Sequence, residues 1–313
     1  MTTWTHRYQP RRRRLRQAGT GPEWARRDAV VCSGGGNLGA AQVGMLQVLL
    51  EAGIQPDLAV GCSVGALNAA YLAVDPTVER MHGLETIWRS IGTADVFPGT
   101  RRSIATHLLR RDPHIYEPDG LRALIARFVP IADLADTAIP VHVMTTDLTR
   151  GAPAWWTAGN PLDVLSASAC LPGIFPPVRL GDGLHVDGGV LCPVPVGRAV
   201  SLGAERIWVL DVTGDRGPVL PARASALDVL LASFAVARRA LLPDPDELGE
   251  PGQQIVRISV GELPHIDVRD FSRTAELVDA GRAAAHAAIV RAMADQPARA
   301  VHTAAGSVLA AAG

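Results

Sequence analysis

One serine in this sequence stands in a pattern that suits a nucleophile. Ser63 is the centre of the segment GCSVG, with Gly61 and Gly65 two residues away on either side. A serine hydroxyl becomes a good nucleophile when it is exposed on a sharp turn, next to a base, with donors ready for the oxyanion. The two glycines permit the strained strand-to-helix turn that such exposure needs. The pattern therefore predicts acyl-transfer chemistry at Ser63.

A run of three glycines lies 27 to 29 residues before this serine. Gly34, Gly35 and Gly36 follow a short apolar run and precede a run with helical spacing. Together with Asn37, they are expected to present backbone N–H groups at a helix N-terminus to one negatively charged oxygen. We therefore predict an oxyanion hole formed by these four residues.

The same glycine turn also fits a dinucleotide-binding pattern. G-x-G-x-x-G is matched through Gly34, Gly36 and Gly39, a weak signal by itself. A site of that kind needs an acid at the end of the second strand, where it binds the ribose. Here Asp57 stands at the start of that strand, so the oxyanion hole is the favoured interpretation.

Asp187 is a candidate for the base. It follows a short apolar strand and precedes Gly188 and Gly189, which allow a close turn of the backbone. A partly buried carboxylate there could accept the Ser63 proton, because burial raises the pKa of aspartate above its usual value of ~4. The alternative is that the segment is only a turn. The residues alone leave both interpretations open.

An esterase with a Ser-His-Asp triad would instead need a late histidine. The candidates are His265, His286 and His302. None lies in a glycine-rich or turn context that would hold it at the end of a sheet. We therefore expect surface or core roles for them.

The three glycine-containing motifs together resemble those of the patatin-like phospholipases. GGGNLG at 34–39, GCSVG at 61–65 and DGG at 187–189 are similar to that family's oxyanion loop, nucleophile elbow and Asp-Gly-Gly/Ala motif, in the same order and with similar spacing. Further similar stretches lie at 56–58, 146–149 and 166–177. The resemblance covers roughly residues 28–290.

The resemblance implies a Ser-Asp dyad without histidine that acts on acyl esters of lipids. In that scheme Ser63 attacks the ester carbonyl, Asp187 takes its proton, and amides of the glycine turn hold the oxyanion. The sequence departs from the family pattern at two places. Leu38 stands where Arg or Lys is frequent, and Cys192-Pro193 stands where Asn is common. Leu38 removes a positive charge beside the oxyanion loop, which bears on anionic head groups more than on ester hydrolysis.

The predicted elements indicate an α/β protein. The chain begins with strand, helix, strand and helix at 29–33, 40–52, 58–60 and 66–73, which implies a parallel sheet covered on both faces. Later strands are expected at 141–145, 154–157, 206–210 and 255–258, and helices at 163–170, 225–242 and 272–293. Segment 225–242 is interpreted as a core helix in preference to a lid or lipid-contacting element. We predict a three-layer α/β/α sandwich with a mainly parallel central sheet.

Composition limits the chemistry and the domain plan. All 30 basic residues are Arg, so lysine-dependent catalysis is excluded. The four cysteines lack C-x-x-C spacing and are expected to be buried free thiols. Residues 1–27 carry eight Arg and one acid and are expected to form a disordered basic arm. We expect this arm to be followed by a hydrolase domain at 28–295 and an Ala-rich tail at 296–313.

We thus expect a cytoplasmic or peripherally membrane-associated serine acyl hydrolase with a lipid or acyl-ester substrate. No cofactor, metal, nucleic acid, secretory signal or transmembrane helix is expected. Three alternatives stay open: a Ser-His-Asp esterase, a non-hydrolytic member of the fold that binds lipid or a partner protein, and a nucleotide-binding oxidoreductase.

Overall fold

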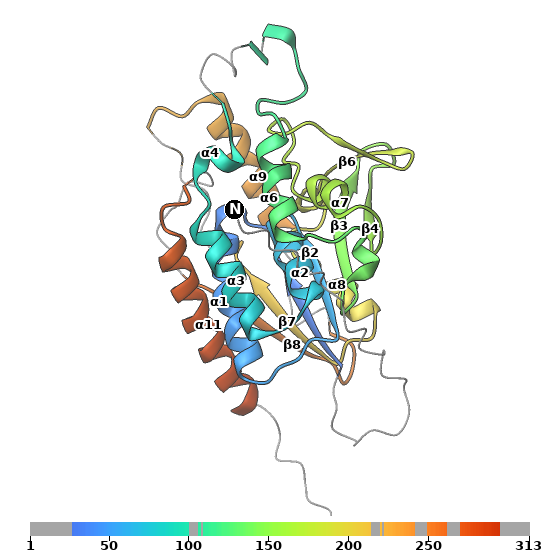
Figure 1. Ribbon diagram of the computed structural model, residues 1–313, viewed down its shortest axis with the longest axis vertical. Coiled ribbons are helices and arrows are strands. Elements are labelled where there is room, and N and C mark those ends of the chain that lie inside the picture. Colours follow the sequence, from blue (N-terminus) through green and yellow to red (C-terminus); the bar gives the residue numbers. More distant parts are fainter. Residues whose placement is uncertain are drawn as a thin grey trace, which may run out of the picture.

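A central sheet with helices on both faces organises the chain (Figure 1). The computed structural model describes residues 27–99, 106–107, 109–213, 220, 222–241, 249–261 and 270–294, and the statements below refer to them. The basic arm before residue 27 and the tail at 296–313 lie outside this range, as do His265 and His302.

Eight strands form the sheet, in the order β5-β6-β3-β2-β1-β7-β8, with β4 paired to β3. Their bounds are β1 (Asp28–Cys32), β2 (Leu58–Cys62), β3 (Val141–Asp147), β4 (Ala152–Trp156), β5 (Val178–Leu180), β6 (Gly183–Asp187), β7 (Arg206–Asp211) and β8 (Gln254–Ser259). The five strands β3-β2-β1-β7-β8 are parallel, whereas β4, β5 and β6 join by antiparallel pairing.

Side chains alternate along the central strands between two apolar cores. Val30 and Trp208 point into the larger core, and Val31 and Val209 point into the smaller one. The helices are α1 (Gly39–Glu51), α2 (Val64–Val74), α3 (Val78–Arg89), α4 (Thr93–Val96), α6 (Asp119–Phe128), α7 (Pro161–Ser168), α8 (Val196–Ser201), α9 (Ala226–Ala240) and α11 (Thr274–Ala294). Helices α1, α2 and α11 contribute to the larger core and α8 to the smaller, so the predicted three-layer α/β/α arrangement is confirmed.

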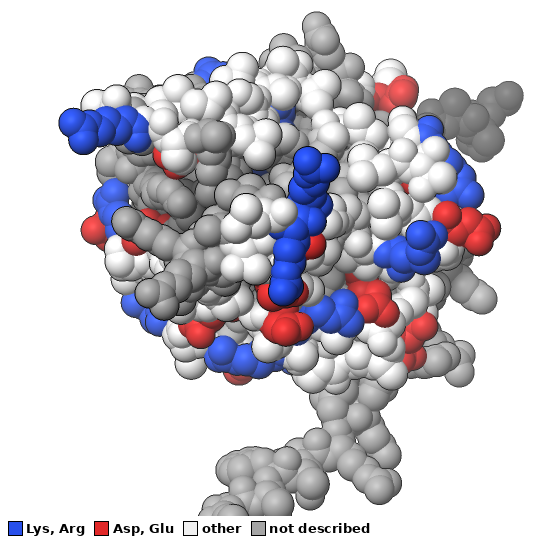
Figure 2. Space-filling view, turned by 90° about the horizontal axis from the view of Figure 1, so that it is seen from above, with Lys and Arg blue, Asp and Glu red and all other residues white. Residues whose placement is uncertain are grey.

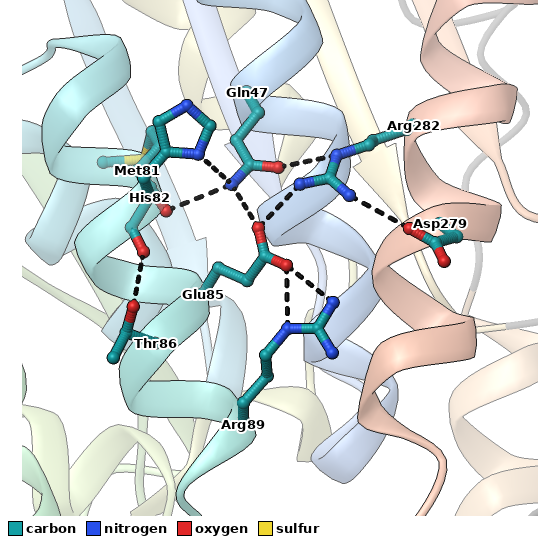
Figure 3. A network of polar contacts seen from close by, with 8 residues as sticks. All are labelled: Gln47, Met81, His82, Glu85, Thr86, Arg89, Asp279 and Arg282. Carbon is teal, nitrogen blue, oxygen red and sulfur yellow. Dashed lines mark hydrogen bonds and ion pairs between the residues drawn. The ribbon is translucent and has the colours of Figure 1, made fainter.

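A polar network fixes three of the covering helices to one another (Figure 3). The amide of Gln47 on α1 donates to the carboxylate of Glu85 on α3 over 2.8 Å. Arg282 on α11 donates to the same carboxylate over 2.6 Å and to the carbonyl of Gln47 over 3.0 Å. Next to it, Gly281 lies so close to α1 that a Cβ there would collide with the carbonyl of Ala41. The layer that supports the glycine turn is thereby held together by both packing and charge.

The described helices include none that is both long and apolar enough to cross a bilayer.

Candidate active site

The sheet brings the ends of β2 and β6 together, although they are far apart in sequence. Both strands pair with the same side of β3, because β4 occupies its other side over residues 143–147. Cys62, at the end of β2, is opposite Met144, and Asp187, at the end of β6, is opposite the next residue, Thr145. The two strands therefore meet end to end, and Ser63 follows β2 at this junction.

Ser63 has the backbone conformation of a strained turn, with φ of 55° and ψ of −131°. The residues two positions away on either side must be glycine. A Cβ on Gly61 would lie 2.5 Å from the Cα of Ala66, and one on Gly65 would collide with the carbonyl of Cys32. Such strain persists only where the surrounding structure enforces it. The predicted turn between a strand and a helix at Ser63 is confirmed, since α2 begins at the next residue.

A hydrogen-bond relay from β3 holds this turn in place. The backbone amide of Ser63 donates to the hydroxyl of Ser168 over 3.0 Å, and that hydroxyl donates to the carbonyl of Met144 over 2.7 Å. On the other side, Thr146 donates to the carbonyl of Asp187 over 3.0 Å. Ser168 and Thr146 lie in the stretches 166–177 and 146–149, which resemble the family. Their hydrogen bonds depend on the strand pairing and could not be inferred from the sequence.

The hydroxyl of Ser63 donates directly to Oδ2 of Asp187 over 2.6 Å. The other carboxylate oxygen accepts the backbone amide of Gly189 over 2.7 Å, so the carboxylate has one fixed orientation. Gly188 cannot carry a side chain, because a Cβ there would collide with Met144. Asp187 is 1% exposed and Ser63 is 8% exposed. The two residues thus form a buried pair in which a carboxylate is placed to receive a hydroxyl proton.

Burial is the main influence on the pKa of Asp187 and raises it. The positive charge of Arg238 and the hydrogen bonds from Ser63 and Gly189 lower it again, but the balance leaves the pKa above its ordinary value. A raised pKa makes the carboxylate a stronger base than an exposed aspartate.

Arg238 is a site residue that sequence reasoning missed. Its side chain extends from α9 to the two glycine turns. Nη2 lies 3.3 Å from the position that a Cβ would take on Gly34, and Nε lies 3.3 Å from the corresponding position on Gly189. Its Nε is buried and has no hydrogen-bond partner among the described residues. In the sequence it reads only as a basic residue at a helix end, and no local pattern signals its position beside Asp187.

The glycine turn lies next to the serine, and a Cβ on Gly34 would be 3.2 Å from that of Ser63. The backbone amide of Gly34 donates to the carbonyl of Pro193 over 2.9 Å, so this amide is already engaged. Pro193, a departure from the family pattern, therefore anchors the turn. Gly36 has φ of 59° and begins the short 3-10 helix η1 (Gly36–Leu38) that leads into α1.

Asp57 and His286, on which two of the alternative functions would depend, are among the described residues. Asp57 accepts the backbone amide of Asp28 over 3.0 Å, at the opposite end of β1 from the glycine turn. His286 is exposed on α11. Within the part of the chain that the structure describes, Ser63 reaches its carboxylate without a histidine between them.

The prediction that 225–242 is a core helix is wrong. Helix α9 occupies Ala226–Ala240, but none of its residues from 228 to 240 is buried, and Val229, Leu230 and Val236 are about half exposed. Its high apolar content suggested burial in a core. The helix instead lies beside the site, where its Arg238 approaches Gly34 and Gly189, and it is seen in the upper part of Figure 1.

Comparison with known proteins identifies relatives of the matched region. A sequence model of the family described as patatin-like phospholipase matches residues 30–200. Lysophospholipase nte1 of Aspergillus terreus is 30% identical over 186 residues, which are 58% of this chain and 12% of that protein. Patatin-like phospholipase domain-containing protein 7 of Rattus norvegicus is 30% identical over 186 residues, which are 59% of this chain and 13% of that protein. The chain therefore corresponds to a small part of these relatives.

Solved structures show weaker similarity. VipD from Legionella pneumophila aligns with 84% of this chain and 67% of its own, at a TM-score of 0.44 and 16% identity. Human GIVD cytosolic phospholipase A2 with a fluorophosphonate inhibitor and terbium chloride aligns with 86% of this chain and 59% of its own, at a TM-score of 0.46 and 12% identity. Because the family model covers more than half of the 313 residues, the chain belongs to the patatin-like phospholipase family.

Proposed function

We propose that this chain is a serine acyl hydrolase that cleaves carboxylic esters of lipids through a Ser-Asp dyad. The observation that carries the proposal is the 2.6 Å hydrogen bond from Ser63 to the buried carboxylate of Asp187, at a strained turn between β2 and α2. Family membership supports a lipid ester as the substrate.

In the proposed first step, Asp187 accepts the proton of Ser63 as the serine oxygen attacks the ester carbonyl. The amides of Gly35, Gly36 and Asn37 stabilise the oxyanion, and Gly34 is left out because its amide is bound to Pro193. Collapse of the tetrahedral intermediate expels the alcohol, which takes the proton from Asp187, and leaves an acyl group on Ser63. Water, deprotonated by Asp187, then releases the acid.

The charge of Arg238 supports an anionic group on the substrate, such as a phosphate ester. Leu38 removes the positive charge that relatives often carry in the oxyanion loop, and Arg238 places one beside Gly34 from α9 instead. Its buried Nε without a partner is a donor that a substrate oxygen could satisfy.

Peripheral contact with a membrane is part of the proposal. The exposed apolar side chains of α9, together with Leu191 after the Asp-Gly-Gly turn, are placed to contact lipid. Figure 2 shows the molecule from above, where basic and acidic residues stand among uncharged ones. Helices that bind at an interface bury apolar faces of this kind.

The substrate class can be tested by measuring fatty-acid release from a lysophospholipid, a diacyl phospholipid and an uncharged p-nitrophenyl ester. We expect release from all carboxylic esters that fit the site, and its loss after treatment with a fluorophosphonate. A folded protein that hydrolyses none of them and takes up no fluorophosphonate would instead favour the non-hydrolytic lipid-binding function.

Arg238 gives a prediction about pH. Because its charge lowers the pKa of Asp187, Arg238→Met should raise that pKa further. The base is active only when ionised, so the acid limb of the kcat/KM profile should move to higher pH, while the rate on the alkaline side changes less. Arg239→Met, at the exposed neighbouring position, is the matched control. An unchanged acid limb in Arg238→Met would contradict this role.

A further inference from the structure

The segment that links α4 to α6 contains a second group of side chains able to do chemistry. His107, His114 and Glu117 bring two imidazole nitrogens and a carboxylate oxygen within 4.8 Å of one another. They follow the pattern H-x6-H-x2-E in a stretch of eleven residues, with Asp112 between the histidines. None of them belongs to the Ser63 site.

The separations suit a single small cation. His107 Nε2 lies 3.6 Å from Oε1 of Glu117, and His114 Nε2 lies 3.9 Å from Oε2 of the same carboxylate. With zinc–ligand bonds of about 2.0–2.1 Å, two ligand atoms of a tetrahedral site lie about 3.3 Å apart. Each nitrogen lies within about 0.6 Å of that separation from one oxygen of Glu117, and the three ligand atoms fall within 4.8 Å of one another.

The hydrogen bonds around His107 have the form found at metal sites. Its Nδ1 is 2.8 Å from Oδ2 of Asp112, a distance at which the ring N–H donates to the carboxylate. That contact fixes the tautomer and leaves the lone pair of Nε2 directed to the side where Glu117 lies. Histidines that bind metals usually give their other N–H to such a carboxylate.

His114 supplies the second observation. Both of its ring nitrogens are buried, and neither has a hydrogen-bond partner among the described residues. Buried polar atoms without a partner are rare in native proteins, and one explanation for them is a bound ion. A cation held between the two imidazoles and Glu117 would satisfy Nε2 of His114.

We propose that His107, His114 and Glu117 bind one zinc ion, with Asp112 orienting His107. Two imidazoles and one carboxylate are ligands that favour Zn²⁺ over Ca²⁺ or Mg²⁺, which prefer oxygen alone. Glu117 is 58% exposed, so solvent can supply the fourth ligand.

The role of this ion is structural. The amides of Ile115 and Tyr116 both donate to the carbonyl of Ile174, in the loop that follows α7. The neighbouring ring of Phe175 stacks on Phe97, which also contacts Tyr116 edge-on. Zinc would thus fix the linking segment against the loop that begins with Cys170, whose carbonyl accepts the amide of Asp187.

The test is a titration of the chelator-treated, tag-free protein with Zn²⁺ in competition with a chromophoric chelator. We expect one ion per chain and a higher thermal midpoint with zinc present. Glu117→Gln and His114→Gln should each weaken binding by at least about tenfold, and Asp112→Asn by about 10–100-fold, as for other residues that orient metal ligands. His286→Gln, at an exposed histidine of α11, is the matched control and should bind as the wild type does.

Glu117→Gln alters an exposed side chain and keeps the proposal testable if the histidine variant fails to fold. Absence of stoichiometric binding to the wild type would overturn the proposal. The proposal would also be overturned if Glu117→Gln and His114→Gln each bound zinc as tightly as the wild type, because zinc would then bind elsewhere.

Discussion

Ser63→Ala should lower the kcat for hydrolysis of p-nitrophenyl butyrate by about 10³–10⁶-fold, as removal of a serine nucleophile does in other hydrolases. The variant keeps the oxyanion donors but has no oxygen to form the acyl-enzyme. Initial rates at saturating ester measure the effect. Alanine also removes the hydroxyl that donates to the buried carboxylate of Asp187, so the thermal midpoint should fall modestly, and a cooperative unfolding transition shows that the variant is folded.

Ser201→Ala is the matched control for this experiment. Ser201 is an exposed serine at the end of α8, and its hydroxyl donates only to the carbonyl of Arg198, one turn back in the same helix. Its replacement should leave kcat unchanged. If Ser63→Ala kept a rate within tenfold of the wild type while folded, another group would have to be the nucleophile.

Asp187→Asn should lower kcat/KM by about 10²–10⁴-fold, the usual contribution of a general base. The amide has nearly the shape of the carboxylate and can still accept the hydrogen bond from Gly189, but it cannot take a proton from Ser63. The wild-type rate should fall as pH drops through the raised pKa of Asp187, and this acid limb should be absent from the variant. A pH profile of kcat/KM for both proteins measures it.

Stability gives an independent readout for the same variant. Burial raises the pKa of Asp187, so the folded state holds this proton more tightly than the unfolded state does. By linkage, ionisation of Asp187 costs stability as pH rises from its unfolded to its folded pKa. The thermal midpoint of Asp187→Asn at neutral pH should therefore equal or exceed that of the wild type. A less stable variant with a persistent acid limb would contradict the assignment of the base.

The turn at Ser63 could be predicted because its requirement is local. A strained backbone between a strand and a helix needs small residues close by in the sequence, and Gly61 and Gly65 stand two positions from Ser63 on either side. The nearness of Asp187 could be expected only through the resemblance to a family. It depends on β6 pairing with β3 from the point where the pairing of β2 with β3 ends. The spacing of residues in the sequence does not indicate which strands pair.

Features that depend on the three-dimensional path of the chain could not be predicted from the sequence. The apolar composition of α9 suits a core as well as a lipid-facing surface, so neither its exposure nor the position of Arg238 could be inferred. The spacing of His107, His114 and Glu117 is visible in the sequence, but only the fold of the linking segment brings their ligand atoms together. Likewise, the engagement of the Gly34 amide follows from the path of the chain at Pro193.

The central claim, that Ser63 carries the acyl group during turnover, is tested most directly by trapping the intermediate. The protein is mixed with p-nitrophenyl butyrate, quenched with acid during the first turnover, digested and examined by mass spectrometry. We expect a butyryl group on the peptide that contains Ser63, and none on the same peptide of Ser63→Ala. A butyryl group on a different side chain, or ester turnover in the wild type with no acylated serine at any quench time, would contradict it.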